Sequence, residues 1–236
     1  MLVMKWIKVY LKLIILILSS VFIYLNYNCK YEKSKIAVLD TGVEKKAIKS
    51  KVISRDFTLD NNWNSVHANK VSKIIEYETD IVIYDAKVLN RHGKGRLEGT
   101  ISALDWAIKN NVDIINLSYG FTKNYPELHR KIKEAHEKGI IIVAANGNDI
   151  FGGKEFPASY KETISVGVLD KEGSKSVFNS NDDADVFISV DNKLPNSGDN
   201  TSMATAYVSN KLTKLCNRNL RNMDKDEILK LINELN

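Results

Sequence analysis

The sequence predicts an α/β fold in which helices cover both faces of a doubly wound, mostly parallel sheet. Short apolar runs rich in β-branched residues alternate with amphipathic stretches from residue 35 onward. The run Ile140-Ile141-Ile142-Val143 is apolar throughout, which is typical of a strand buried on both faces. Alternation of strands with helices favours parallel βαβ units, and no internal repeat interrupts it.

Each element is placed by its own pattern. Apolar runs bounded by polar residues predict strands at 35–39, 81–89, 112–117, 140–144, 163–168 and, more weakly, 186–190. Apolar residues at helical spacing predict helices at 67–76, 97–110, 127–138, 202–215 and 225–235, the last with Asp224 as its N-cap. Because the carboxyl ends of parallel strands meet at one edge of a sheet, the residues that follow these strands should converge there.

The composition limits the classes of function. With 236 residues, 44% of them hydrophobic and 27% charged, the chain can bury one sizeable core. The net charge of +5 comes from scattered lysines and not from a basic stripe with interleaved aromatics, so nucleic-acid binding is not expected. Cys29 and Cys216 do not make a disulfide framework and are interpreted as free thiols. The histidines lack zinc-site spacing, and no pattern indicates an oligomeric state.

The first 30 residues differ in kind from the domain expected over 31–236. Residues 13–25 are apolar apart from two serines, and lysines precede them at positions 5, 8 and 12. A helix over 9–27 reaches the ~20 residues that cross a bilayer if Lys12 extends to the headgroups. No small-x-small pair marks a good cleavage site, so we expect a retained membrane anchor with the domain outside the cytoplasm. A cleaved signal peptide and a secreted domain are the alternative.

Three short motifs carry the chemistry. Asp40-Thr41-Gly42 follows the first predicted strand, His67 opens an amphipathic stretch, and Ser202 opens a helix within the motif 200–205. An acid, an imidazole and a hydroxyl are the parts of a serine nucleophile system. Each residue alone has an ordinary structural explanation, such as a turn or a helix cap. Their order, Asp then His then Ser, differs from the order in trypsin-like enzymes and in α/β-hydrolases.

Together these motifs resemble those of the subtilisin-like serine proteases, the subtilases, in which this order occurs. Residues 67–71, His-Ala-Asn-Lys-Val, are similar to the family's His-Gly-Thr-His-Val motif, and residues 201–205, Thr-Ser-Met-Ala-Thr, are close to its serine motif. The resemblance extends roughly over residues 35–215 and includes the segments 114–120, 143–148, 156–158 and 164–167. It implies a subtilisin-like fold and a serine endopeptidase that acts on peptides or proteins.

The resemblance also implies catalytic roles for single residues. Ser202 is expected to attack the peptide carbonyl, with His67 as the base that takes its proton. Asp40 is expected to hold the imidazole in the correct tautomer. The tetrahedral intermediate needs hydrogen-bond donors for its oxyanion, and the side chain of Asn148 is expected to be one of them, with the Ser202 main-chain N–H as the second. Asn146, in the same segment, is the rival candidate and is interpreted as a turn residue.

Substrate binding is expected at two segments that the resemblance identifies. The substrate main chain should pair with Ser118, Tyr119 and Gly120 as an added strand, and Gly93 belongs to a glycine-rich loop that forms the second wall. Main-chain pairing gives affinity with little sequence preference, so the preferred side chain is not predicted. No cofactor is expected, and the connection over 71–81 is too short for the calcium-binding loop that many relatives insert there.

Four positions depart from the family pattern: Ala68, Lys70, Asn200 and Ala206. Ala206 should be harmless in a helix, and Asn200 is expected to be tolerated because asparagine adopts positive φ readily. Glycine at position 200 should raise the rate if Asn200 restricts the loop that presents Ser202. Lys70 lies one helical turn from His67 and should lower its pKa. These departures leave open the alternative of a catalytically weak or inactive binding or regulatory protein with the subtilase fold. An esterase that uses the same residues is a third class.

Overall fold

The computed structural model describes residues 10, 12, 14–17, 19–20, 33–60, 65–149, 151–189, 200–215 and 220–234. Its contacts divide the chain into two units, Met1–Lys33 and Ser34–Asn236. The described residues between 10 and 20 are helical and exposed. No helix within the described ranges is long and apolar enough to cross a membrane. Much of the predicted anchor over 9–27 lies outside the described residues, as do both cysteines, so the anchor stays a prediction.

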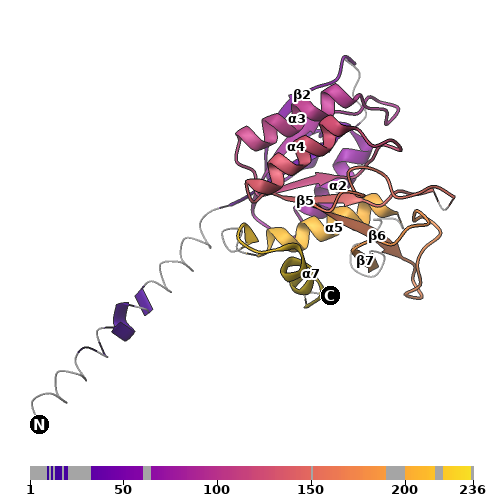
Figure 1. Ribbon diagram of the computed structural model, residues 1–236. Helices are drawn as coiled ribbons and strands as arrows, with labels where there is room; N and C mark the ends of the chain where they lie inside the picture. Colours follow the sequence, from indigo (N-terminus) through magenta and orange to yellow (C-terminus); the bar gives the residue numbers. More distant parts are fainter. Residues whose placement is uncertain are drawn as a thin grey trace, which may run out of the picture. The chain divides into compact units, whose positions relative to one another are not determined.

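The second unit is built on a seven-stranded sheet in the order β2-β3-β1-β4-β5-β6-β7 (Figure 1). The strands are β1 Ser34–Asp40, β2 Lys51–Asp56, β3 Ile81–Lys87, β4 Ile114–Leu117, β5 Ile141–Ala145, β6 Thr163–Leu169 and β7 Val186–Ser189. Every neighbouring pair is parallel. β3 and β2 lie on one side of β1 and the remaining strands on the other, so the sheet is doubly wound, as the sequence predicts.

Helices cover both faces of this sheet. They are η1 Lys45–Ala47, α2 Val66–Ile75, α3 Leu97–Lys109, α4 Pro126–Glu137, α5 Thr201–Thr213 and α7 Lys225–Glu234. Apolar residues of α2, α5 and α7 share one core with Ile36 and Val38 of β1. Those of α3 and α4 share the opposite core with Ala37 and Leu39, because successive residues of a strand point to opposite faces. All the predicted strands and helices are confirmed, with slightly shifted ends.

The edge strand β2 is absent from the sequence prediction. Its sequence, Lys-Val-Ile-Ser-Arg-Asp, has no apolar run, and all of its residues are partly or fully exposed. It pairs only with β3, and edge strands accept charged side chains because only part of their surface is covered. Asp56 at its end accepts a hydrogen bond of 2.9 Å from the ammonium of the fully buried Lys87. The strand is therefore held by backbone pairing and one ion pair more than by apolar packing.

The last helix, α7, begins as the sequence predicts. Asp224 Oδ1 accepts a hydrogen bond of 2.9 Å from the main-chain N–H of Glu227. In return Glu227 Oε2 accepts one of 2.9 Å from the main-chain N–H of Asp224. This reciprocal capping box satisfies two donors that a helix N-terminus otherwise leaves open. Ile228 and Ile232 anchor the helix in the core.

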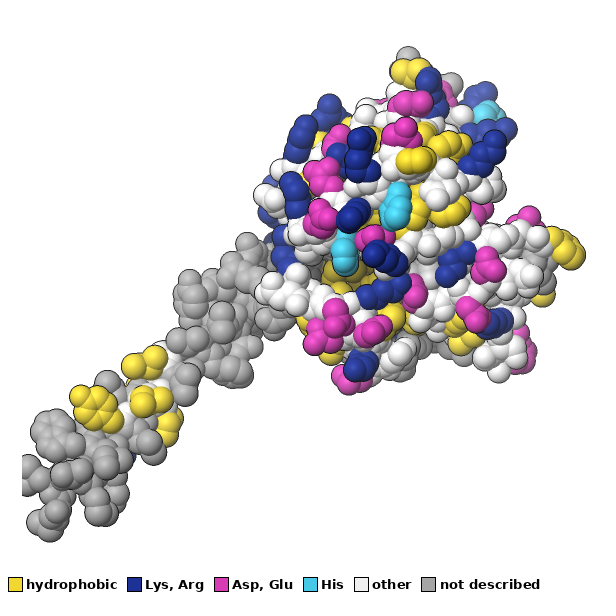
Figure 2. Space-filling view, viewed as in Figure 1, with side chains coloured by type: hydrophobic (Ala, Val, Ile, Leu, Met, Phe, Trp, Pro, Cys, Tyr) yellow, Lys and Arg dark blue, Asp and Glu magenta, His cyan; other side chains and the backbone are white. Residues whose placement is uncertain are grey.

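The surface of this unit carries both signs of charge. In Figure 2, lysine and arginine side chains are interspersed with aspartate and glutamate over the face that is displayed. On α4, Lys131 binds Asp105 of α3 at 2.5 Å and Glu134 of its own helix at 2.6 Å. Mixed charge of this kind is typical of a solvated surface.

The carboxyl ends of three central strands meet at one edge, as the topology requires. Asp40 is the last residue of β1, Leu117 of β4 and Ala145 of β5. Two helices begin close to this edge, since α2 brings His67 and α5 brings Ser202 as the second residue of each helix. The free N–H groups of a helix's first turn favour negative charge nearby. This edge is therefore where the chemistry predicted from the sequence should be found.

Candidate active site

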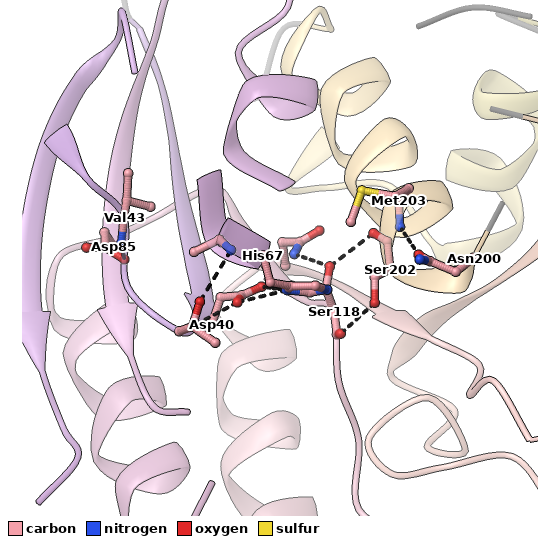
Figure 3. A network of polar contacts seen from close by, with 11 residues as sticks. Asp40, Val43, His67, Asp85, Ser118, Asn200, Ser202 and Met203 are labelled. Carbon is pink, nitrogen blue, oxygen red and sulfur yellow. Dashed lines mark hydrogen bonds and ion pairs between the residues drawn. The ribbon is translucent and has the colours of Figure 1, made fainter. Parts of the chain in front are cut away.

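Asp40 and His67 form a tight pair. Asp40 is fully buried, and both oxygens of its carboxylate contact His67 Nδ1, Oδ1 at 2.9 Å and Oδ2 at 2.8 Å (Figure 3). The main-chain N–H of Thr41 donates a further hydrogen bond of 2.6 Å to Asp40 Oδ1. With Nδ1 donating to the carboxylate, Nε2 of the ring is left as the nitrogen that accepts a proton.

Opposing influences set the pKa of His67. Burial of the ring is the largest of them and lowers the pKa, because it disfavours the charged imidazolium. The hydrogen bond to Asp40 and the negative charge of that carboxylate outweigh burial, so the pKa of His67 lies above its ordinary value. The positive charge of Lys70 acts against Asp40 and lowers the pKa, in the direction that the sequence predicts.

Ser202 lies in the first turn of α5 and is almost fully buried. Its hydroxyl donates a hydrogen bond of 2.9 Å to the main-chain carbonyl of Ser118. The hydroxyl of Ser118 donates in the opposite direction, to the carbonyl of Ser202, at 3.1 Å (Figure 3). Among the described residues no hydrogen bond joins Ser202 to His67. The structure therefore forms the acid–base half of the predicted triad, with the Ser202 hydroxyl directed to the carbonyl of Ser118.

Asn116 of β4 forms side-chain hydrogen bonds that connect Ser118 with α5. Its side-chain amide donates a hydrogen bond of 3.0 Å to the hydroxyl of Ser118. Its side-chain carbonyl accepts one of 3.0 Å from the hydroxyl of Ser209 on α5. Asn116 and Ser209 are fully buried, so water does not compete for these bonds. The sequence pointed to Asn116 only as part of a matching segment, and its positioning contacts appear only in the structure.

The two asparagines considered for the oxyanion differ in which side-chain atoms are engaged. The side-chain carbonyl of Asn148 accepts hydrogen bonds from the main-chain N–H of Thr201 at 3.1 Å and from its hydroxyl at 2.8 Å. Its amide group has no acceptor among the described residues, so it is available as a donor beside the start of α5. Asn146 is fully buried and donates its amide to the carbonyl of Asp182 at 2.9 Å. This favours Asn148 as the oxyanion donor.

Three of the four predicted substrate-binding residues, Gly93, Ser118 and Tyr119, line one pocket of about 390 Å³, which His67 also lines. Gly93 has φ 71°, the left-handed region that favours glycine. The phenol of Tyr119 forms a hydrogen bond of 2.8 Å with the hydroxyl of Thr100, which ties Tyr119 to α3. Gly120 does not line this pocket, and a methyl group at its position would meet the side chain of Glu155.

The expectation about Asn200 is wrong in its reason. Asn200 has φ −141° and ψ 162°, which is extended backbone open to any residue. It is the N-cap of α5, and its side-chain carbonyl accepts a hydrogen bond of 3.1 Å from the main-chain N–H of Met203. Asparagine thus contributes to the helix that presents Ser202. The methyl groups of Ala68 and Ala206 are packed in the core.

Asp85 is a buried carboxyl group that sequence reasoning missed. Its Oδ1 accepts a hydrogen bond of 3.1 Å from the main-chain N–H of Val43 and so holds the loop that follows Asp40 (Figure 3). Burial raises the pKa of Asp85 to about 6. The signal in the sequence is a single acidic residue inside an apolar strand. Within the described residues no group of three or more His, Cys, Asp or Glu side chains is placed to hold a metal ion.

The family model described as "Subtilase family" matches residues 32–234. Subtilisin DY from Bacillus licheniformis is 27% identical over 199 residues, which cover 77% of this chain and 69% of that protein. The intracellular serine protease of Paenibacillus polymyxa is 31% identical over 211 residues, covering 75% of this chain and 65% of that protein.

A third relative is much longer than this chain. The minor extracellular protease Epr of Bacillus subtilis (strain 168) is 28% identical over 197 residues, covering 74% of this chain and 30% of that protein. The chain thus spans less than two thirds of the length of two of these three relatives. In all three the matched region takes up about three quarters of this chain.

Proposed function

The chain belongs to the subtilase family, a family of serine-type endopeptidases, and we propose that it hydrolyses peptide bonds with Asp40, His67 and Ser202. The observation that carries this proposal is the contact of His67 Nδ1 with the buried Asp40 carboxylate at 2.8 Å. In the proposed reaction Ser202 Oγ attacks the peptide carbonyl while His67 Nε2 takes its proton. His67 then protonates the leaving amine. In the second step water attacks the acyl-enzyme while His67 takes its proton, and His67 returns that proton to Ser202 Oγ as the product acid leaves.

The oxyanion of the tetrahedral intermediate is proposed to lie at the start of α5. There the side-chain amide of Asn148 and the main-chain N–H of Ser202 would donate to it. The proposal is supported by the two hydrogen bonds from Thr201 that occupy the other end of the Asn148 amide. In subtilisin, removal of such a side-chain donor costs on the order of 10²–10³ in kcat.

The substrate is proposed to bind as an extended chain along Ser118, Tyr119 and Gly120, with the loop at Gly93 as the opposite wall. The carbonyl of Ser118 now accepts the hydroxyl of Ser202 at 2.9 Å. When Ser202 rotates toward His67, this carbonyl becomes free to accept a main-chain N–H of the substrate. Substrate binding at the Ser118 carbonyl and rotation of the Ser202 hydroxyl away from it would then favour one another.

The proposed location is outside the cytoplasm, tethered by residues 9–27, so that the substrates are exported or membrane-proximal peptides. The apolar run over 13–25 with lysines before it supports a tether. A cleaved segment and a secreted domain are the alternative, and one relative is named an extracellular protease. Carbonate extraction of cells that express the full chain separates the two, because a tethered chain stays with the membranes at its uncleaved mass. A soluble form that begins near residues 21–30 would favour secretion.

The alternative of a weak or inactive protein is favoured by one observation, the engagement of the Ser202 hydroxyl with Ser118 and not with His67. Incubation of the full chain with a broad peptide library, followed by mass spectrometry of the products, tests the proposal. Cleavage that disappears in Ser202→Ala supports an endopeptidase. Hydrolysis of peptide esters without hydrolysis of peptide amides would point to an esterase, and absence of both to the inactive protein.

A further inference from the structure

We propose that Glu155 gives this peptidase a preference for substrates with lysine or arginine at the residue whose carbonyl is attacked, the P1 residue. This inference rests on the proposed peptidase function and specifies its substrate class. Glu155 lies in the segment between β5 and β6 and has no part in the acid–base chemistry described above.

The side chain of Glu155 lies beside two glycines, Gly120 and Gly147, near the carboxyl ends of β4 and β5. A methyl group placed on Gly120 would come within 2.5 Å of Glu155 Oε2 and 2.6 Å of Glu155 Cβ. One placed on Gly147 would come within 3.3 Å of Glu155 Cγ. Gly120 is two residues from Ser118, whose carbonyl binds the nucleophile, and Gly147 directly precedes Asn148. The carboxylate is thus placed between the proposed substrate strand and the proposed oxyanion donor.

The backbone holds Glu155 in this position from both sides. Its main-chain N–H donates a hydrogen bond of 3.2 Å to the carbonyl of Asn146, at the end of β5. The next residue, Phe156, exchanges two hydrogen bonds with Phe121, at 2.7 and 2.8 Å. Glu155 therefore lies between a bond to the end of β5 and a single antiparallel β-bridge to Phe121, and a side chain on such a support is held in place.

The carboxylate of Glu155 lacks a partner inside the protein. Among the described residues no hydrogen-bond donor and no cation contacts it, although the side chain is only partly exposed. Burial, and then the negative charge of Asp149, raise the pKa of Glu155. Both influences make the ionised group costly in the free protein, and a cation bound beside it would remove that cost. The neighbouring Lys154 directs its ammonium to the hydroxyl of Ser165, at 3.5 Å.

A substrate chain paired with residues 118–120 would bring its P1 side chain to this carboxylate. A lysine or arginine there would gain a charge-assisted hydrogen bond, and a glutamate would be repelled. A neutral P1 side chain would bury the carboxylate further without supplying a donor. Lysine at P1 should be preferred over a neutral P1 residue by about tenfold or more in kcat/KM, which is the size of effect expected of a partly desolvated ion pair.

The test uses the full chain and three peptide amides that differ only at P1, which is lysine, norleucine or glutamate. We expect kcat/KM to fall from lysine to norleucine to glutamate. Glu155→Gln should lower the lysine-to-norleucine ratio about tenfold, and Glu155→Lys should make glutamate the preferred residue. Asp149→Asn should change the ratio less, because Asp149 is exposed and accepts the main-chain N–H of Phe151 at 2.9 Å. The exposed Glu172→Gln is the matched control.

Labelling of Ser202 with a fluorophosphonate probe, which carries no P1 side chain, separates the possible failures. If Ser202 is labelled and the lysine-to-norleucine ratio is the same in the wild type and Glu155→Gln, this inference is wrong and the peptidase function stands. If Ser202 is not labelled and no peptide is cleaved, both fail together. Melting temperatures of the variants show whether each one folds.

Discussion

Ser202 and Ser118 are joined by two hydrogen bonds that run in opposite directions. The Ser202 hydroxyl donates to the Ser118 carbonyl at 2.9 Å, and the Ser118 hydroxyl donates to the Ser202 carbonyl at 3.1 Å. The pair ties the start of α5 to the segment that follows β4, and the side-chain amide of Asn116 donates a hydrogen bond to the Ser118 hydroxyl. The pair holds Ser202, the proposed nucleophile, next to the strand that we propose the substrate joins.

The charge of Lys70 should tune the pH at which the enzyme works. The base must be neutral to act, so the acid limb of kcat/KM follows the pKa of His67. Lys70 lowers that pKa against the raising effect of Asp40. Lys70→Gln should therefore move the acid limb to higher pH, and the effect should be small because Lys70 is exposed and its charge is screened by solvent. Lys73→Gln, one turn further along α2, is the control, and an equal limb in wild type and Lys70→Gln would reject this electrostatic role.

Asn200 should stabilise the helix that carries Ser202. Asn200→Ala removes the bond to the main-chain N–H of Met203 and should cost about 1 kcal/mol of unfolding free energy, with a smaller cost for Asn200→Gly. Asn200→Ser retains an acceptor and should stay close to the wild type. Urea unfolding of the three variants measures the order. A gain in stability for Asn200→Gly would mean that the backbone at this position needs glycine after all.

Asp85 should make stability depend on pH. Its pKa is raised from 3.8 to about 6, so the folded chain keeps a proton that the unfolded chain loses between these values. Stability is therefore lost as the pH rises through this window. Asp85→Asn, which keeps an acceptor for the main-chain N–H of Val43, should be more stable than the wild type above pH 6 by about 1–3 kcal/mol. The gain should shrink toward pH 4, and a difference independent of pH would contradict the account.

Substitutions of Asn148 should change kcat and the melting temperature to different extents. Asn148→Asp keeps the oxygen that accepts from Thr201 and removes the amide donor. We expect kcat to fall by about 10²–10³ with a small change in melting temperature. Asn148→Ala should lose the same catalytic donor and also the contact to α5. Equal kcat in Asn148→Asp and the wild type would shift the search for the donor to another residue.

Much of the fold could be predicted because parallel strands buried on both faces are continuous apolar runs, as in 140–143. The edge strand β2 could not be predicted, since all of its residues are partly or fully exposed and its sequence has no apolar run. The sequence predicts the wrong conformation for Asn200, because asparagine adopts positive φ readily, whereas here the residue is an extended N-cap of α5. Glu155 gives no signal in the sequence, because the closeness of its side chain to Gly120 arises only when the chain folds.

The central claim, that Ser202 is the nucleophile activated by His67 and Asp40, is tested most directly by covalent labelling. The full chain is treated with a fluorophosphonate probe, and the modified residue is located by mass spectrometry. We predict a single adduct on Ser202 that is absent in Ser202→Ala, strongly reduced in His67→Ala, and unchanged in the exposed Ser174→Ala. An adduct that persists in Ser202→Ala, or equal labelling of the His67→Ala variant and the wild type, would contradict the account.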